Sequence, residues 1–428
     1  MRISKSSDGI ARVWLGVILL LALGLRLGWG ASRPASDVYL AALPDQVEYL
    51  SIARNLLIGR GLSFIDPRFQ ERVYAFRTPG YPMFVAACGG NVRAVRLAQG
   101  VLDTGTALAV FVLAILLMPG ARRRVPLAAA GLVAFNPFLI YFSGLLLSET
   151  LFTAMLAWGM VLLISGNAGP DRPPRAFIWL AGGILLALAV LVRPSAAPLP
   201  IILAIAAAFA NHTRGVAYQP PWPLPVASTL LVVVLLVLTP WALRNYRIFH
   251  ELIWTDTNAG FTLYDGYNPD ATGASDQRFI RYLPQLRLMG EAQRSEYLTL
   301  RARSYIQRHP RRVLDLAAAK AGRTWSPVPL SEQFGKLMYR WIAGLYSVPF
   351  DLLVLWAIWR GNLRKPAKTF LLTPAIYLTV VHALTIGSLR YRLPAEPPMA
   401  VLAACILNRK EPRWKRAKRA AMTSLDDE

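Results

Sequence analysis

The segments Pro44-Asp45-Gln46-Val47-Glu48-Tyr49 and Arg77-Thr78-Pro79-Gly80-Tyr81-Pro82 dominate the long polar stretch in the first half of the chain. This stretch lies between two strongly apolar segments, 13–31 and 94–118. If both apolar segments cross a membrane, the stretch between them brings a carboxylate, an arginine and a rigid turn to one membrane face. We therefore interpret it as a candidate active-site loop and the rest of the chain as its scaffold.

Composition indicates a polytopic membrane protein, because 55% of the 428 residues are apolar. The net charge of +23 favours an anionic partner, but basic and aromatic residues do not alternate along one groove. We therefore expect membrane lipids and a lipid phosphate as partners, and no nucleic acid. Cys88 and Cys405 are predicted near opposite membrane faces, and the four histidines lack the spacing of zinc ligands. We expect no metal site and no required cofactor.

The predicted fold is an all-α bundle of about ten transmembrane helices. The expected spans are 13–31, 94–118, 125–142, 148–165, a fifth ending at Val192, a sixth ending near Ala210, 226–242, 338–359, 369–388 and 394–407. An even number of crossings places both termini and the short basic loops in the cytoplasm, in agreement with the positive-inside rule. The chain is then a multi-pass protein of the plasma (inner) membrane.

Two long segments, 32–92 and 243–336, are predicted to face the outside. The second is too polar to cross the membrane, and we expect membrane-surface helices at 291–308 and 310–325. The predicted domains are an N-terminal membrane module 1–242 that contains the 32–92 loop, an outer-face helical segment 243–336, C-terminal transmembrane helices 337–408 and a basic cytoplasmic tail 409–428.

Asp45 and Arg77 are candidate site residues in the first outer loop. Asp45 follows a proline and begins a helical pattern near the membrane surface, where a fixed carboxylate suits a general base. Asp45 and Glu48 also have the spacing of a helix capping box, so a purely structural role stays open. Arg77 precedes a turn fixed by two prolines and a glycine, which suits a phosphate clamp or simply a turn into a helix.

Glu149 is expected to begin the fourth span at the outer face. Acidic groups are favoured at helix N-termini, but at membrane depth they also tend to mark functional sites. Asp103 shares a helical face with Arg96 and Gln99, and we expect a buried structural pair there.

Arginines also follow the seventh and ninth spans at the outer face. Arg244, Arg390 and Arg392 oppose the usual orientation bias of charges, so we expect a bound anion, although snorkelling to lipid headgroups explains one or two of them. The turn-rich segment 258–269 is either a sugar-contacting loop or an ordinary loop. The possible sugar or acceptor contacts are Tyr49, Tyr81, Asn245, Tyr264 and Asn268.

The chain resembles bacterial members of glycosyltransferase family 39 with the GT-C fold, relatives of protein O-mannosyltransferases and of the lipid A aminoarabinose transferase. The resemblance extends from the first span to the last. It rests on Asp45 with Tyr49 and Ala53-Arg54-Asn55-Leu56 through Gly59-Arg60-Gly61, Arg77 through Pro82, Ser148-Glu149, Pro240-Trp241 with Arg244-Asn245-Tyr246, and Arg390-Tyr391-Arg392-Leu393-Pro394. Where such a protein would carry a Gly-Asn-Asn-Pro-like run, this chain has Gly266-Tyr267-Asn268-Pro269.

The resemblance implies an inverting hexosyl- or pentosyltransferase that takes its sugar from a polyprenyl-phosphate donor. Transfer to an envelope acceptor, which is a protein, lipid A or a glycan, would occur on the outer, periplasmic face. Asp45 matches the catalytic base and Glu149 a second acid of such enzymes. The arginines Arg77, Arg244, Arg390 and Arg392 would bind the lipid phosphate. Two other functions stay open: a transporter or flippase of lipid-linked sugars, which should show internal repeats and broken helices, and a noncatalytic lipid-binding membrane component.

Overall fold

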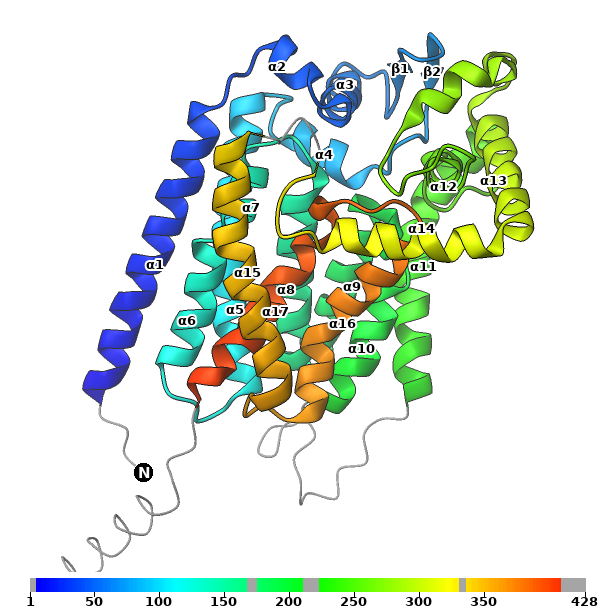
Figure 1. Ribbon diagram of the computed structural model, residues 1–428. Helices are drawn as coiled ribbons and strands as arrows, with labels where there is room; N and C mark the ends of the chain where they lie inside the picture. The colour runs from blue at the N-terminus through cyan, green and yellow to red at the C-terminus, as the bar shows by residue number, and fades with distance from the viewer. Residues whose placement is uncertain (1–4, 168–174, 211–222, 331–335, 409–428) are drawn as a thin grey trace, which may run out of the picture.

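A computed structural model describes residues 5–167, 175–210, 223–330 and 336–408, and the predicted tail 409–428 lies outside these residues. A bundle of long helices forms one end of the molecule and a smaller outer layer covers the other (Figure 1). Each predicted span coincides with one helix or with consecutive short ones. The bundle helices are α1 (Lys5–Ser32), α5 (Val92–Leu117), α6 (Arg124–Ala134), α7 (Pro137–Ser143), α8 (Ser148–Gly166), α9 (Ala176–Val192), α10 (Leu199–Ala210), α11 (Pro223–Phe249), α15 (Leu337–Arg360), α16 (Lys365–Ala383) and α17 (Glu396–Ala404).

Length and composition decide which of these helices can cross a bilayer. Among the described residues, α1, α5, α8, α11 and α15 are long and apolar enough, and the bent pair α6–α7 makes a sixth candidate. α9 and α10 are shorter apolar helices, and 3₁₀ turns at Pro194–Ala196, Leu389–Ala395 (η5) and Cys405–Leu407 (η6) flank the remaining short elements. The expected bundle of apolar helices is confirmed, while ten crossings stay a prediction.

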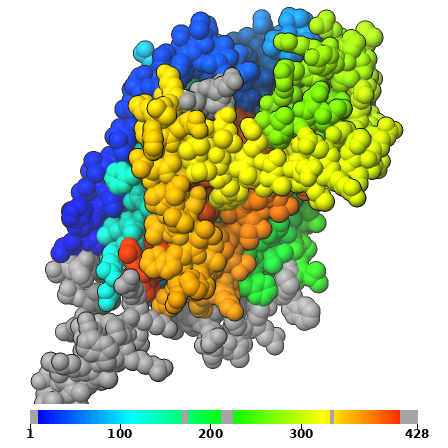
Figure 2. All heavy atoms as spheres, viewed as in Figure 1, coloured from blue at the N-terminus to red at the C-terminus, as the bar shows by residue number. Residues whose placement is uncertain are grey.

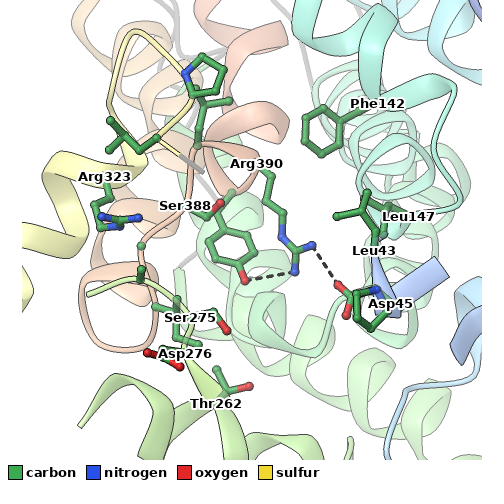
Figure 3. A pocket seen from close by; sticks show the side chains of 18 of the residues that line it. Leu43, Asp45, Phe142, Leu147, Thr262, Ser275, Asp276, Arg323, Ser388 and Arg390 are labelled. Carbon is green, nitrogen blue, oxygen red and sulfur yellow. Dashed lines mark hydrogen bonds and ion pairs between the residues drawn. The ribbon is translucent and has the colours of Figure 1, made fainter. Parts of the chain in front are cut away.

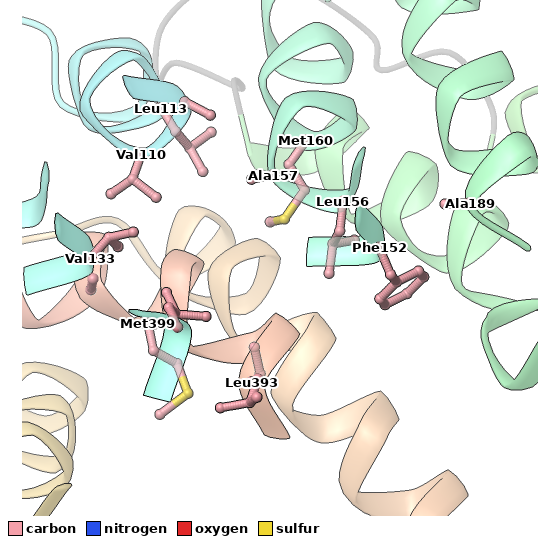
Figure 4. Packing of buried hydrophobic residues seen from close by; sticks show 14 of the residues in the cluster. Val110, Leu113, Val133, Phe152, Leu156, Ala157, Met160, Ala189, Leu393 and Met399 are labelled. Atoms are coloured by element: carbon pink, nitrogen blue, oxygen red, sulfur yellow. The ribbon is translucent and has the colours of Figure 1, made fainter. Parts of the chain in front are cut away.

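α8 lies at the centre of the bundle, where it packs against α5, α9 and α10. A helix that is apolar on all sides is typical of such a buried position. Leu156 and Met160 of α8 face the same apolar cluster as Met399 of α17 (Figure 4). At Gly159 a Cβ atom would lie 2.6 Å from the side chain of Leu186 in α9, so the glycine lets these two helices approach closely.

A buried ion pair joins α1 to α5. Arg26 Nε lies 2.6 Å from Asp103 Oδ2, and Arg26 also donates to two carbonyls at the C-terminal end of α6. The predicted pairing of Asp103 with Arg96 is therefore wrong. Arg96 lies near the start of α5 and donates to two carbonyls of the segment that follows α1. Asp103 lies deeper in the bundle, where water does not solvate its carboxylate. The guanidinium of a neighbouring helix stabilises the charge instead.

The predicted span 125–142 is broken near its outer end. Pro137 begins α7 because it cannot continue α6, and the two helix axes differ by 50°. Asn136 caps α7 through the backbone N–H groups of Phe138 and Leu139, and its side-chain amide donates to Glu396 of α17. The sequence analysis had not found this broken helix.

The outer layer combines the two long polar segments. The first contains α2 (Asp37–Ala41), α3 (Pro44–Leu57), an antiparallel pair of strands β1 (Phe64–Asp66) and β2 (Glu71–Val73), and α4 (Gly80–Ala87). The second contains α12 (Asn258–Gly266), the 3₁₀ helices η2 (Gln277–Tyr282) and η3 (Pro284–Leu288), α13 (Glu291–Arg308) and α14 (Pro310–Thr324). The helices predicted at 291–308 and 310–325 are thus confirmed.

The two outer segments share one hydrophobic core, which joins Phe64 and Phe76 to Phe261, Leu298 and Leu316. Together the two segments cover one end of the bundle (Figure 2). The first segment is blue in this view, and the second is green to yellow. The predicted end of the seventh span at 242 falls inside α11, which continues to Phe249. The last turns of α11 therefore reach into the outer layer.

Candidate active site

A pocket of about 940 Å³ lies between the outer layer and the bundle. One side of it is charged and includes Asp45, Arg77 and Arg390. Another side is apolar, and its residues come from α7 and α15: Pro137, Phe138, Tyr141, Phe142, Tyr339, Ile342 and Ala343. The pocket can therefore hold a charged group against one surface and an apolar chain against the surface beside it.

Asp45 lies on the pocket wall, where it contacts Arg390 (Figure 3) and also Arg77. Pro44 occupies the first turn of α3, so the carboxylate of the next residue is held at the helix start. Asp45 Oδ1 accepts a hydrogen bond of 2.6 Å from Arg77, and Oδ2 accepts one of 2.9 Å from Arg390. Arg77 follows β2 and Arg390 belongs to η5, so three distant parts of the sequence meet at this carboxylate.

Glu48 contacts Arg77 and does not form a capping box. The N-cap residue of α3 is Leu43, and it receives no side-chain cap. Glu48 Oε2 instead accepts a 2.8 Å hydrogen bond from Arg77 Nε. The capping role predicted for Asp45 and Glu48 is wrong because Pro44 starts the helix one residue too early for that spacing.

The electrostatics of the site keep Asp45 ionised. Burial raises the pKa of Asp45, but the attraction of Arg77 and Arg390 outweighs it and holds the pKa well below its usual range. The pKa of Glu48 is raised, first by burial and despite Arg77, with the neighbouring charge of Asp45 adding to the effect. Asp45 is therefore a carboxylate at any physiological pH, and a weak base as long as both arginines hold it.

Glu149 lies in the first turn of α8, as predicted, directly behind Arg390. Its Oε1 is 3.5 Å from Arg390 Nε and 3.7 Å from Arg193 Nη1, while its Oε2 has no hydrogen-bond partner among the described residues. Arg193 was not among the predicted site residues. The signal that could have found it is an arginine placed directly at the end of an apolar helix, where it needs a buried partner. The Tyr391 ring lies 5.2 Å from the Arg193 guanidinium and 5.1 Å from that of Arg390, and it stacks on His382 with ring centroids 3.9 Å apart.

Arg244 and Arg392 do not line the pocket. Arg244 donates to the carbonyls of Leu62 and Tyr74 and so ties α11 to the β1–β2 region. Arg392 is fully buried beneath the pocket and pairs with Glu396 at 2.9 Å. Both arginines hold the scaffold together in this structure, whereas Arg77 and Arg390 face the pocket.

The five predicted sugar or acceptor contacts are also packed into the scaffold. Tyr49 and Tyr81 meet edge to face at 4.7 Å, and Tyr264 belongs to the outer-layer core. The side-chain amide of Asn245 donates to the carbonyl of Ile253, and that of Asn268 donates to carbonyls at the end of α12. None of the five is among the residues that line the pocket.

The outer layer adds further polar groups to the pocket. Asn258 and Thr262 belong to the segment 258–269, which begins as the helix α12 and not as a loop. The others were not named from the sequence: Arg68, Thr272, Ser275, Asp276, Gln277, Arg278 and Arg323. These positions carry no shared motif, and only folding places them around one space. In the part of the chain that the structure describes, no three His, Cys, Asp or Glu side chains gather where a metal ion could bind. Asp45 and Glu48 share Arg77 and so form a cation-neutralised pair, which does not fit a metal-ligand set.

Two solved structures share this architecture with the chain. The oligosaccharyltransferase AglB from Archaeoglobus fulgidus, solved with an inhibitory peptide and a dolichol-phosphate, matches 99% of this chain with a TM-score of 0.57 and 14% identity. ArnT from Cupriavidus metallidurans, solved with undecaprenyl phosphate, matches 97% of it with a TM-score of 0.51 and 15% identity. The chain spans 55% of the first protein and 63% of the second.

These likenesses confirm the GT-C fold that the sequence resemblance implied. Comparison of the sequence with protein-family models and with curated proteins gives no match. The comparisons therefore establish the architecture, and the activity is a proposal that rests on the geometry of the site.

Proposed function

We propose that the chain is a membrane glycosyltransferase that moves a sugar from a polyprenyl-phosphate donor to an envelope acceptor at the outer face of the plasma membrane. The observation that carries the proposal is Asp45, held between Arg77 and Arg390 on the wall of the pocket. The fold shared with AglB and ArnT, both solved with a polyprenyl-type phosphate, supports it. A base next to two phosphate-binding groups is the arrangement that glycosyl transfer from a lipid phosphate needs.

The shape of the pocket supports a lipid donor. The apolar residues of α7 and α15 give a polyprenyl chain a surface to lie against. The charged wall receives the phosphate and the sugar. The bend at Pro137 turns α7 away from the axis of α6, so the aromatic side chains Phe138 and Phe142 reach the pocket.

The proposed reaction is a single inverting displacement. The acceptor hydroxyl of a protein, lipid A or a glycan attacks the anomeric carbon, and its proton passes to the Asp45 carboxylate. The bond between the sugar and the phosphate oxygen breaks, and the polyprenyl phosphate leaves with the electron pair. Asp45 therefore ends the step protonated and releases its proton when the product leaves.

Arg77 and Arg390 have two partners in this scheme. Without donor they neutralise Asp45 and Glu48. When the donor phosphate arrives, the guanidinium groups turn part of their hydrogen bonds toward its oxygens, which develop charge as the sugar departs. Asp45 loses the cations that lower its pKa and becomes a stronger base at that moment. We propose that the arginines neutralise the phosphate without a required metal ion.

The direct test uses purified full-length protein in lipid vesicles and a labelled polyprenyl-phosphate sugar. Asp45→Asn should lower sugar transfer by at least about 10²-fold, the usual contribution of a positioned general base. The matched control is Asp37→Asn, which removes an exposed carboxylate from the same outer segment. Substantial transfer by a folded Asp45→Asn protein would remove the base assignment.

The wild-type protein decides the class of activity in the same assay. Covalent transfer to an acceptor supports the glycosyltransferase. Movement of the intact donor across the vesicle membrane identifies a transporter, and retention of the donor with neither result identifies a noncatalytic lipid-binding component.

A further inference from the structure

Five arginines line the pocket: Arg68, Arg77, Arg278, Arg323 and Arg390. Four of them pair with a carboxylate. Arg68 lies 2.7 Å from Asp66, Arg77 lies 2.6 Å from Asp45, Arg278 lies 2.5 Å from Asp276, and Arg390 lies 2.9 Å from Asp45. Arg323 has no ion pair or side-chain hydrogen bond to any residue that the structure describes. The positive charge available to an incoming anion therefore lies on Arg323.

Arg323 occupies the last turn of α14 and is half-buried. Its Nε atom is buried without a hydrogen-bond partner among the described residues. A buried donor without a protein partner is unfavourable, so it needs water or a ligand to complete it. Among the described residues with such a buried group, Arg323 is the one that lines the pocket. A role in stabilising the helix C-terminus alone would be expected to use this donor on a carbonyl, and the described residues provide no such contact.

The surroundings of Arg323 indicate what kind of anion it meets. Pro329 and Leu330 line the same pocket shortly after α14, and Ile342 of α15 adds to this apolar side. Figure 3 shows Arg323 on the opposite side of the pocket from Asp45, with Arg390 between them. An anion that reaches Arg323 therefore lies against apolar side chains and within the same space as the proposed catalytic base.

We propose that Arg323 binds the phosphate of the lipid-linked donor. This proposal rests on the proposed function and names a residue that the sequence resemblance did not. A phosphate between Arg323 and Arg390 would leave the polyprenyl chain on the α7 and α15 surface and direct the sugar toward Asp45. The planar guanidinium of arginine offers two parallel donors to phosphate oxygens, so it fixes the orientation of the group as well as its charge.

The binding test uses the full-length protein in phosphatidylcholine nanodiscs and radiolabelled undecaprenyl phosphate. Arg323→Gln should raise the Kd by about 10- to 100-fold, which is the contribution expected of a hydrogen bond to a charged group. Arg323→Lys keeps the charge without the fork and should lie between wild type and Arg323→Gln. Binding of undecaprenol, which lacks the phosphate, should not depend on residue 323.

The matched control is Arg311→Gln, which removes an exposed arginine from the same helix and should leave the Kd unchanged. Equal weakening by Arg311→Gln would mean a general electrostatic effect and would overturn the proposal. The proposal would also be overturned if a folded Arg323→Gln protein bound undecaprenyl phosphate with wild-type affinity. This holds as well if its KM for the acceptor rises instead. A wild-type protein that does not bind undecaprenyl phosphate at all would overturn the proposed function as well, which separates the two failures.

Discussion

Arg77 and Arg244 look alike in the sequence, since each stands near the outer end of an apolar or turn segment and was expected to bind phosphate. The structure gives them different surroundings. Arg77 lines the pocket and holds Asp45 and Glu48, whereas Arg244 donates to the carbonyls of Tyr74 at 2.7 Å and Leu62 at 2.8 Å. We predict that Arg77→Gln and Arg244→Gln fail in different ways.

Arg77→Gln should lower the kcat of sugar transfer by about 10²- to 10³-fold, because it removes one preorganised donor to the leaving phosphate, worth ~2.7–4 kcal/mol in comparable sites. Arg244→Gln should leave the kcat of the folded protein close to wild type. It should lower the free energy of unfolding by ~3 kcal/mol, because two charged hydrogen bonds are lost and each contributes ~1.5–3 kcal/mol, with the lower value expected for a partly exposed group.

The two effects are measured on the same preparations. Transfer from a labelled polyprenyl-phosphate sugar gives kcat at saturating donor, and denaturant unfolding in mixed micelles gives stability. Arg392→Gln provides a second comparison, since Arg392 is buried outside the pocket. If Arg244→Gln lowers kcat as much as Arg77→Gln does and leaves the stability unchanged, then Arg244 acts on the substrate. The assignment of roles to the arginines by whether they line the pocket would then be wrong.

Three further predictions concern the scaffold. Arg26→Met should destabilise the bundle by ~3–5 kcal/mol because Asp103 is left buried and unpaired, and adding Asp103→Leu should restore most of this loss in denaturant unfolding. Burial raises the pKa of Asp265 from 3.8 to about 6, so the folded protein binds the extra proton and the free energy of unfolding falls as pH rises from about 4 to 6, by ~3 kcal/mol at most. Asp265→Asn should flatten this fall in unfolding experiments at several pH values, because the amide oxygen can still accept from the Asp276 N–H and the amide NH2 can donate to the Ser275 hydroxyl oxygen. Gly80→Ala should lower kcat, because its Cβ would lie 2.7 Å from the Leu191 carbonyl oxygen and displace the turn that carries Arg77; unchanged transfer would show that this turn tolerates movement.

The pattern of apolar segments was enough to predict the helices. A stretch of about twenty apolar residues has few other stable conformations in a bilayer, so the bundle follows from composition and length. In the second outer segment the helices at 291–308 and 310–325 were predicted, whereas α12 was expected to be a loop. The break at Asn136 was missed because Pro137 lies inside an apolar run, and a proline alone does not show whether a helix bends, ends or continues.

Side-chain partners could not be predicted in this way. Asp103 shares a helical face with Arg96, but its partner Arg26 comes from another helix. Glu48 has the spacing of a capping residue, but it binds Arg77, which lies well beyond its own helix. Spacing reports only the neighbours within one helix, while a buried charge is satisfied by whichever opposite charge the fold brings closest.

The sequence by itself determined the apolar helices and the polar outer segments, because both follow from local pattern. It also singled out Asp45, Arg77, Glu149 and Arg390 as candidate site residues from the cost of charge near a membrane and from the resemblance. The tertiary structure alone decided which arginines face the pocket. Arg244 and Arg392 are held by the scaffold, Arg193 supports Glu149, and Arg323 remains without a partner among the described residues. The physical reason is that a guanidinium acts according to the acceptors within its reach, and those acceptors come from segments far apart in the chain.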